Sequence, residues 1–234
     1  MQNELLLIIS LVILFGGLLF VLRLFGRAGL YIFSAVATVL ANIEVMILVR
    51  AFGMEMTLGN ILFAATFLVT DILSELYGKQ YAQKAVNLSI FGSVLFLLVS
   101  QSWLLYVPAA SDWAMPSFQT LFTNTPRLLL ASLVVFAFTQ TFDVWLYHKW
   151  WEFTTHRFGS SERFLWVRNN GSTLFSQLLN TLLYSIFAFA GVYSVDTLIS
   201  IVLSTYVIFI FTSLADTPVI YAARWMKKHC KLPD

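Results

Sequence analysis

Two acidic residues, Asp71 and Glu75, lie inside an apolar run that covers residues 58–77. If this run is an α-helix, their spacing of four residues places both carboxylates on one face, about one turn apart. Two neighbouring anions in apolar surroundings need a cation, a proton or a hydrogen-bond donor beside them. The pair therefore indicates a ligand-binding site, with a purely structural pairing as the alternative.

Two further apolar runs also carry polar residues. Residues 127–148 include Gln140 and Asp143, which lie on neighbouring faces of a helix because they are three positions apart. Asp143 is either part of the same site or an anchor paired with Lys149 or another basic residue at that interface. Residues 172–194 carry the densest polar stripe, with steps of three and four residues: Ser172, Thr173, Ser176, Gln177, Asn180, Thr181 and Tyr184. One side of this helix is expected to face a polar cavity, although small hydroxyl residues also allow close helix packing.

Asn42 and Arg168 complete the set of candidate site residues. Asn42 adds an amide in the outer half of an apolar run that covers residues 30–50. Arg168 precedes the polar stripe by four residues. It either bridges to one of the three carboxylates, Asp71, Glu75 or Asp143, or is only one of the positive charges that mark the cytoplasmic side of the membrane.

The residue types in this set suit binding better than catalysis. The sequence has no nucleophile with a neighbouring base, no glycine-rich phosphate loop and no arginine cluster. Cys230 is the only cysteine, and the three histidines lack the spacing of metal ligands, so no metal or cofactor is expected. Carboxylates, amides and aromatic rings suit a neutral planar heterocycle with a donor edge. They would also suit another polar metabolite or a proton path.

The elements that must position these residues are membrane-spanning helices. Of the 234 residues, 59% are hydrophobic and 11% charged, against about 25% charged residues in soluble proteins. The apolar positions collect into runs of the length that crosses a bilayer, near residues 5–25, 30–50, 58–77, 86–107, 127–148, 172–194 and 198–222. This pattern predicts an all-α, polytopic transmembrane bundle in one domain, residues 1–234, with about seven spans, six core helices plus one N-terminal helix. The connections are too short for a soluble catalytic domain, and the net charge of +2 does not suggest nucleic acid.

The basic residues predict the orientation of the bundle, because positively charged loops stay on the cytoplasmic side. With the N-terminus outside and the C-terminus in the cytoplasm, all Lys and Arg residues except Arg50 and Arg127 fall on the cytoplasmic side. The first run lacks a positive region before it and a cleavage site after it, so it is expected to remain as a span.

Four segments, in this order, resemble the queuosine precursor transporter family, which is also called the vitamin uptake transporter family. They are TFLVTDILSELYGK at residues 66–79, FDV at 142–144, LWVR at 165–168 and STLFSQ at 172–177. Their joint occurrence is far more specific than any one segment, and the resemblance runs from about Asn42 to the end of the last helix.

The resemblance implies an inner-membrane carrier of bacteria or archaea for deazapurine precursors of the tRNA base queuosine. The motif positions of the family fall on Asp71, Glu75, Asp143, Arg168, Ser172, Thr173 and Gln177. One departure is Asn180, because the family usually has an aspartate before the threonine at this point. The loss of that carboxylate puts the identity of the accepted precursor in doubt.

We therefore expect an uptake transporter with no enzymatic activity, embedded as a multi-pass protein in the inner (plasma) membrane. Its substrate site is predicted to include Asn42, Asp71, Glu75, Gln140, Asp143, Arg168, Ser172, Thr173, Gln177 and Asn180. The alternatives are a carrier or a substrate-binding subunit for another nucleobase or vitamin, and, less favoured, a membrane enzyme that uses the three carboxylates as acids and bases. The expected partners are a small deazapurine and the lipid bilayer, without direct contact to nucleic acid. A homodimer and an energising partner subunit both stay open.

Overall fold

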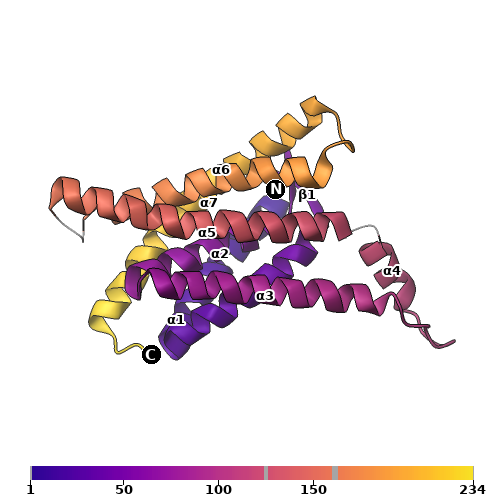
Figure 1. Ribbon diagram of the computed structural model, residues 1–234, viewed down its shortest axis with the longest axis horizontal. Coiled ribbons are helices and arrows are strands. Elements are labelled where there is room, and N and C mark those ends of the chain that lie inside the picture. Colours follow the sequence, from indigo (N-terminus) through magenta and orange to yellow (C-terminus); the bar gives the residue numbers. More distant parts are fainter. Residues whose placement is uncertain (1, 124–125, 160–162, 234) are drawn as a thin grey trace.

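The computed structural model describes residues 2–123, 126–159 and 163–233 (Figure 1). In chain order its elements are α1 (Gln2–Glu44), β1 (Leu48–Ala51), β2 (Met54–Thr57), α2 (Gly59–Leu76), α3 (Lys79–Trp103), α4 (Met115–Thr123), α5 (Pro126–Phe158), α6 (Leu165–Phe189) and α7 (Val195–His229). Among these described helices, six are long and apolar enough to cross a membrane, all except α4. The predicted polytopic helical bundle is therefore confirmed.

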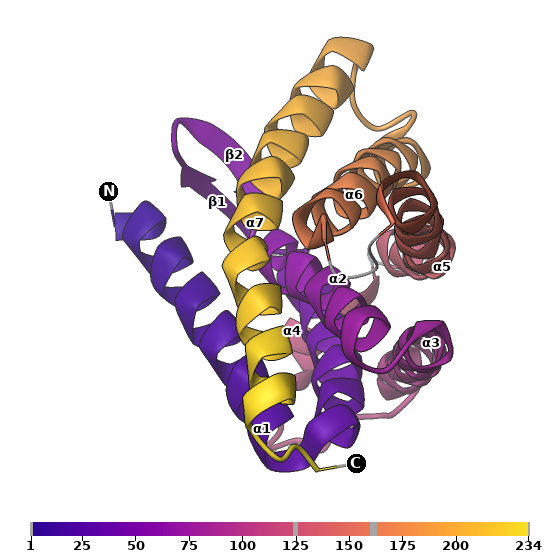
Figure 2. The ribbon, with the colours of Figure 1, turned by 90° about the vertical axis from the view of Figure 1, so that its left-hand side faces the viewer.

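The long helix α1 consists of two arms that meet at Gly26, whose φ of 55° and ψ of −138° are not helical. Near the start of the first arm, Asn3 Nδ2 donates a hydrogen bond to the carbonyl oxygen of Arg50 at 2.9 Å. Near Gly26, Arg23 Nη1 donates to the carbonyl oxygen of Lys231 at 2.9 Å. The first arm therefore runs from the end with the β-hairpin, the hairpin end, to the end with the C-terminus, the C-terminal end (Figure 2). The second arm returns, so α1 contains the first two predicted spans.

The hairpin corrects the predicted second span, which was wrong at its C-terminal end. Its helix stops at Glu44, and β1 pairs with β2 in antiparallel register, with Leu48 opposite Thr57. Phe52 and Gly53 form the turn with positive φ values of 54° and 76°, which suits the twist of a two-residue hairpin. Periodicity missed this hairpin because its first strand continues the apolar run of the helix.

Several helices also extend beyond their predicted bounds. α5 continues ten residues past the predicted end of 127–148, because its last three turns are polar enough to lie beyond the apolar window. α6 begins at Leu165, seven residues before the predicted start, and so includes Arg168. The predicted connection around residues 108–126 contains the short helix α4.

α2 occupies the centre of the bundle, and this position determines where the site lies. It packs against α1, α3, α5 and α7 (Figure 2). Within its most apolar window 83% of the residues are buried, whereas this share is 22–44% in the other candidate spans. Since neighbouring helices separate α2 from lipid, its acidic residues face protein and not hydrocarbon, as polar groups inside membranes generally do.

Gly26 allows the sharp elbow between the arms of α1. A Cβ atom at this position would collide with the backbone of Pro233, and its positive φ is a conformation that other residues adopt only with strain. We expect Gly26→Ala to destabilise the protein by roughly 1–3 kcal/mol or more. Thermal unfolding in detergent would measure this loss. Gly16→Ala is the matched control, since a Cβ there meets nothing within 4 Å; equal effects of both substitutions would contradict the role of Gly26.

The orientation of the termini stays a prediction, and labelling of single cysteines tests it. Cys230 follows α7 at the C-terminal end and is expected to face the cytoplasm. Asp112 lies in the exposed connection between α3 and α4 and is expected outside. A membrane-impermeant maleimide should label Asp112→Cys, in a Cys230→Ser background, in intact cells. It should label native Cys230 only after permeabilisation, and the reverse pattern would invert the topology.

Candidate functional site

Asp71 lies on the buried face of α2 and is held from α6. Its side chain is almost fully buried, and Thr173 Oγ1 donates a hydrogen bond to Asp71 Oδ2 at 2.9 Å. Asp71 Oδ1 has no hydrogen-bond partner among the described residues. The carboxyl group is therefore fixed in place and still has capacity to accept from a ligand.

Asp143 of α5 lies beside Asp71 and is fully buried. Neither of its carboxyl oxygens has a hydrogen bond of good geometry to any described residue, although Ser172 and Ser176 are adjacent. Lys149, the basic residue that could have anchored it, instead forms a salt bridge with Glu152 at 2.8 Å. Asp143 therefore has no salt bridge to Lys149 or to another basic residue within the described part of the chain.

Asp71 and Asp143 are called the carboxyl pair below. Two glutamines near this pair differ in their hydrogen bonds. Gln140 joins α5 to α2, because its Nε2 donates to Thr66 Oγ1 at 2.7 Å and its Oε1 accepts from Thr70 Oγ1 at 3.2 Å. Gln177 of α6 is equally buried, but neither atom of its amide has a partner in the described part of the chain. Gln140 is thus a structural link, whereas Gln177 is available to a ligand.

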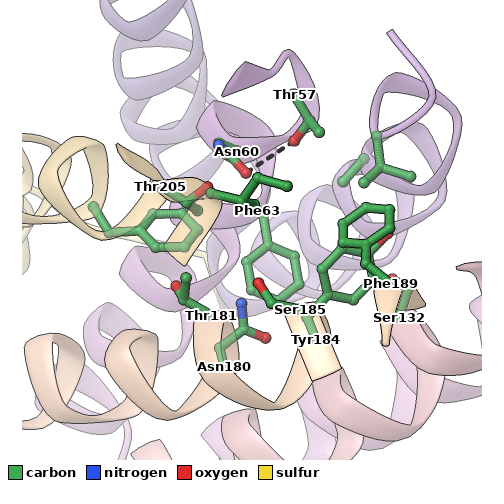
Figure 3. A pocket seen from close by; sticks show the side chains of 15 residues that line it. Thr57, Asn60, Phe63, Ser132, Asn180, Thr181, Tyr184, Ser185, Phe189 and Thr205 are labelled. Carbon is green, nitrogen blue, oxygen red and sulfur yellow. Dashed lines mark hydrogen bonds between the residues drawn. The ribbon is translucent and has the colours of Figure 1, made fainter. Parts of the chain in front are cut away.

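A cavity of about 70 Å³ lies at the hairpin end, with space for several water molecules. Asn180, Thr181 and Tyr184 of α6 face Phe63 of α2 across it (Figure 3). Thr139 Oγ1 lies 3.4 Å from Asn180 Oδ1. Because Thr139 is one turn from Asp143 and Asn180 is two turns from Thr173, the cavity and the carboxyl pair lie about 6–10 Å apart along the helices.

Asn42 supports the wall of this cavity without lining it. Its Oδ1 accepts a hydrogen bond of 2.6 Å from Ser132 Oγ, and Ser132 lines the cavity. Its Nδ2 points toward Ser93 Oγ of α3, at 3.5 Å. The predicted site residue Asn42 is therefore separate from the carboxyl pair.

Glu75 and Arg168 form a closed cluster toward the C-terminal end. Arg168 Nη2 and Nε donate to Glu75 Oε2 at 2.7 and 3.0 Å, and Nη2 also reaches Oε1 at 2.9 Å. Tyr147 donates to Glu75 at 2.8 Å, and the guanidinium of Arg168 lies 4.3 Å from the ring centroid of Trp151. Arg224 approaches Glu75 to 3.7 Å. Arg168 thus bridges to Glu75 and leaves the carboxyl pair without a basic partner.

The sequence-based site omitted a polar cluster between α6 and α7. Asn169 Nδ2 donates to Asp216 Oδ1 at 3.0 Å, and Asn170 Nδ2 donates to Thr217 Oγ1 at 2.7 Å. Ser213 also donates to Asn170, at 3.1 Å. The two asparagines could have been found, because they extend the polar stripe of α6 by one turn.

The unpartnered atoms define what the site can do. Asp71, Asp143, Ser176 and Gln177 together offer carboxylate acceptors, a hydroxyl and an amide, all buried. Ser172 Oγ is occupied by the carbonyl oxygen of Arg168, at 2.8 Å. In residues 2–123, 126–159 and 163–233, no group of three His, Cys, Asp or Glu residues could hold a metal ion. The arrangement suits recognition of a polar molecule by hydrogen bonds.

A multi-pass helical bundle with buried polar side chains at its centre has the architecture of a membrane transport protein. Residues 57–223 match the family model described as "Putative vitamin uptake transporter", and the chain belongs to this family of the inner membrane. It is similar to a protein of Bacillus subtilis (strain 168) named "Probable queuosine precursor transporter", with 41% identity over 202 residues that cover 86% of each chain. No solved structure matches the chain. The resemblance inferred from the four motifs is thereby confirmed.

Proposed function

We propose that this protein imports queuosine precursors, which are 7-deazaguanine bases such as 7-cyano-7-deazaguanine, its aminomethyl form or queuine. The observation that carries the proposal is the set of buried polar atoms without partners at Asp71, Asp143, Ser176 and Gln177. A buried polar group without a hydrogen bond costs about 1–3 kcal/mol, and a charged group costs more. A ligand that satisfies these atoms removes this penalty.

A guanine-like base has the edge that this site needs. Its ring N–H and amino group are adjacent donors, and a carboxylate such as that of Asp71 can accept from both. Its carbonyl oxygen can accept from the amide of Gln177. The hydrogen bond of 2.9 Å from Thr173 Oγ1 to Asp71 Oδ2 holds this carboxylate, so the acceptor is oriented before the base binds.

The two ends of the bundle suit alternating access. The cavity beside Asn180 lies at the hairpin end, which we place outside, about 6–10 Å from the carboxyl pair along the helices. Toward the other end, Glu75 and Arg168 form a buried salt bridge, which in our proposal acts as the closed gate. Substrate passage requires this end to open while the cavity closes, as in carriers with a central site.

Complementation tests the proposal. The chain is expressed in a bacterium that lacks both queuosine precursor synthesis and its own carrier, each precursor is supplied at limiting concentration, and queuosine is measured in tRNA. Restoration by one precursor would establish uptake and name the substrate. Failure with every precursor, despite expression in the membrane, would contradict the proposal.

A vitamin carrier is the second candidate, because the matching family model is described by vitamin uptake. Competition separates the two candidates. Excess unlabelled guanine should inhibit uptake of a labelled deazapurine if the site recognises the guanine edge, whereas a vitamin site would not respond to guanine.

Asn180→Asp should change which precursor is preferred. Asn180 lines the cavity, where its Oδ1 lies 3.4 Å from Thr139 Oγ1. A carboxylate would favour the cationic aminomethyl precursor over the neutral cyano form. Uptake of both precursors by the variant and the original protein measures the shift, and identical ratios would show that position 180 does not select the substrate.

A further inference from the structure

Three buried carboxyl groups converge at the centre of the bundle without a basic partner. Asp71, Asp143 and Asp216 come from α2, α5 and α7, and each side chain is at most 2% exposed. Asp71 lies within the range of electrostatic interaction with both Asp143 and Asp216. None of the three takes part in a salt bridge within the described residues.

The other ionisable groups around Asp143 do not balance these charges. Besides Asp71 and Asp216, the groups that face this region are Glu75 of α2, Tyr147 of α5, Arg168 of α6 and Arg224 of α7. Arg168 donates to both carboxylate oxygens of Glu75, and Arg224 lies 3.7 Å from Glu75 Oε1, so both cations are held by Glu75 and not by the three aspartates. One ionised carboxylate in a span already costs about 2.5–3.5 kcal/mol, and adjacent like charges add repulsion. The cluster therefore needs a proton.

The hydrogen bonds distinguish the three carboxyl groups. Asp71 accepts from Thr173 at 2.9 Å, and Asp216 accepts from Asn169 at 3.0 Å. Neither oxygen of Asp143 has a hydrogen bond of good geometry to a described residue, although Ser172 and Ser176 are adjacent. Hydrogen bonds to a carboxylate stabilise its charged form, so Asp143 is the group that gains most from a proton, which it can then share with Asp71.

We infer that uptake is coupled to protons and that Asp143 carries the proton, an inference that rests on the proposed function. A proton from the outer solution enters through the cavity and binds a carboxylate oxygen of Asp143. Asp71 stays ionised and accepts from the substrate. When the C-terminal end opens, the proton and the chemically unchanged substrate leave to the cytoplasm, and Asp143 returns as a carboxylate.

Proteoliposomes test the coupling. The membrane potential is held at zero with valinomycin and equal potassium, and the outside is made one pH unit more acidic than the inside. One proton per neutral substrate predicts about tenfold accumulation of labelled 7-cyano-7-deazaguanine. Asp143→Asn should lose this accumulation, because its side chain has no carboxyl group to carry the proton. Asp143→Glu should keep coupling, and Glu152→Gln, which changes an exposed carboxylate of the same helix, should behave as the original protein.

A second measurement does not depend on substrate. Infrared difference spectroscopy should detect the carbonyl stretch of a protonated carboxyl group in the original protein and in Glu152→Gln, and not in Asp143→Asn. Absence of this band would overturn the inference. Uptake of a precursor that does not depend on the pH gradient would also overturn it, but would leave the proposed function intact. Accumulation that persists in Asp143→Asn would also overturn the assignment to Asp143. If no precursor is transported, the proposed function fails, and the infrared band still tests whether Asp143 is protonated.

Discussion

Asp71→Asn is expected to abolish uptake of the deazapurine while the protein still inserts into the membrane. The substitution keeps the size of the side chain and replaces an acceptor by an NH2 group, which would face the donors of the substrate. Loss of a charge-assisted hydrogen bond, together with an unpaired donor, amounts to roughly 3 kcal/mol, which is about a hundredfold in affinity. Insertion should not suffer, since the substitution removes a charge from a span.

Queuosine in tRNA, measured at limiting precursor, reports this loss, and an immunoblot of membranes reports insertion. Glu55→Gln is the control, because it neutralises an exposed carboxylate in the hairpin. Thr173→Val should give a partial defect, with a higher KM, because Thr173 only orients Asp71. Normal uptake by Asp71→Asn would remove Asp71 from the site.

Arg168→Met should cause the largest loss of stability. The substitution leaves Glu75, whose side chain is 4% exposed, without the partner that binds it at 2.7 Å. Removing one member of a buried ion pair typically costs about 3–5 kcal/mol. The contact with Trp151 is lost as well. Thermal unfolding in detergent, which needs no substrate, would measure the effect.

The double variant Glu75→Gln with Arg168→Met separates charge from packing. Because it removes both charges, it should regain most of the stability, as buried pairs replaced by neutral groups often do. Lys149→Met is the matched control, since it breaks an exposed salt bridge to Glu152 that is worth about 0–1 kcal/mol. Equal losses in the single and double variants would show that Arg168 stabilises the protein by packing alone.

The candidate site was predictable as a set of residue types and only in part as a set of contacts. The spacing of Asp71 and Glu75 on one face of a helix was sufficient to single out α2, and the structure places both of them in the interior of the bundle. Their partners were not predictable, because Arg168 lies about ninety positions away and three carboxylates were possible for it. The hairpin was missed because a short strand and the end of an apolar helix have the same composition.

Sequence by itself determined that this chain is a multi-pass membrane protein of the vitamin uptake transporter family. Hydropathy is a property of consecutive residues, and the family motifs are short runs of consecutive residues, so both are visible without a fold. Only the tertiary structure decided that Arg168 binds Glu75 and leaves Asp71 and Asp143 together. This choice depends on how α2, α5 and α6 are rotated against one another, and that rotation follows from packing between segments that are far apart in the chain.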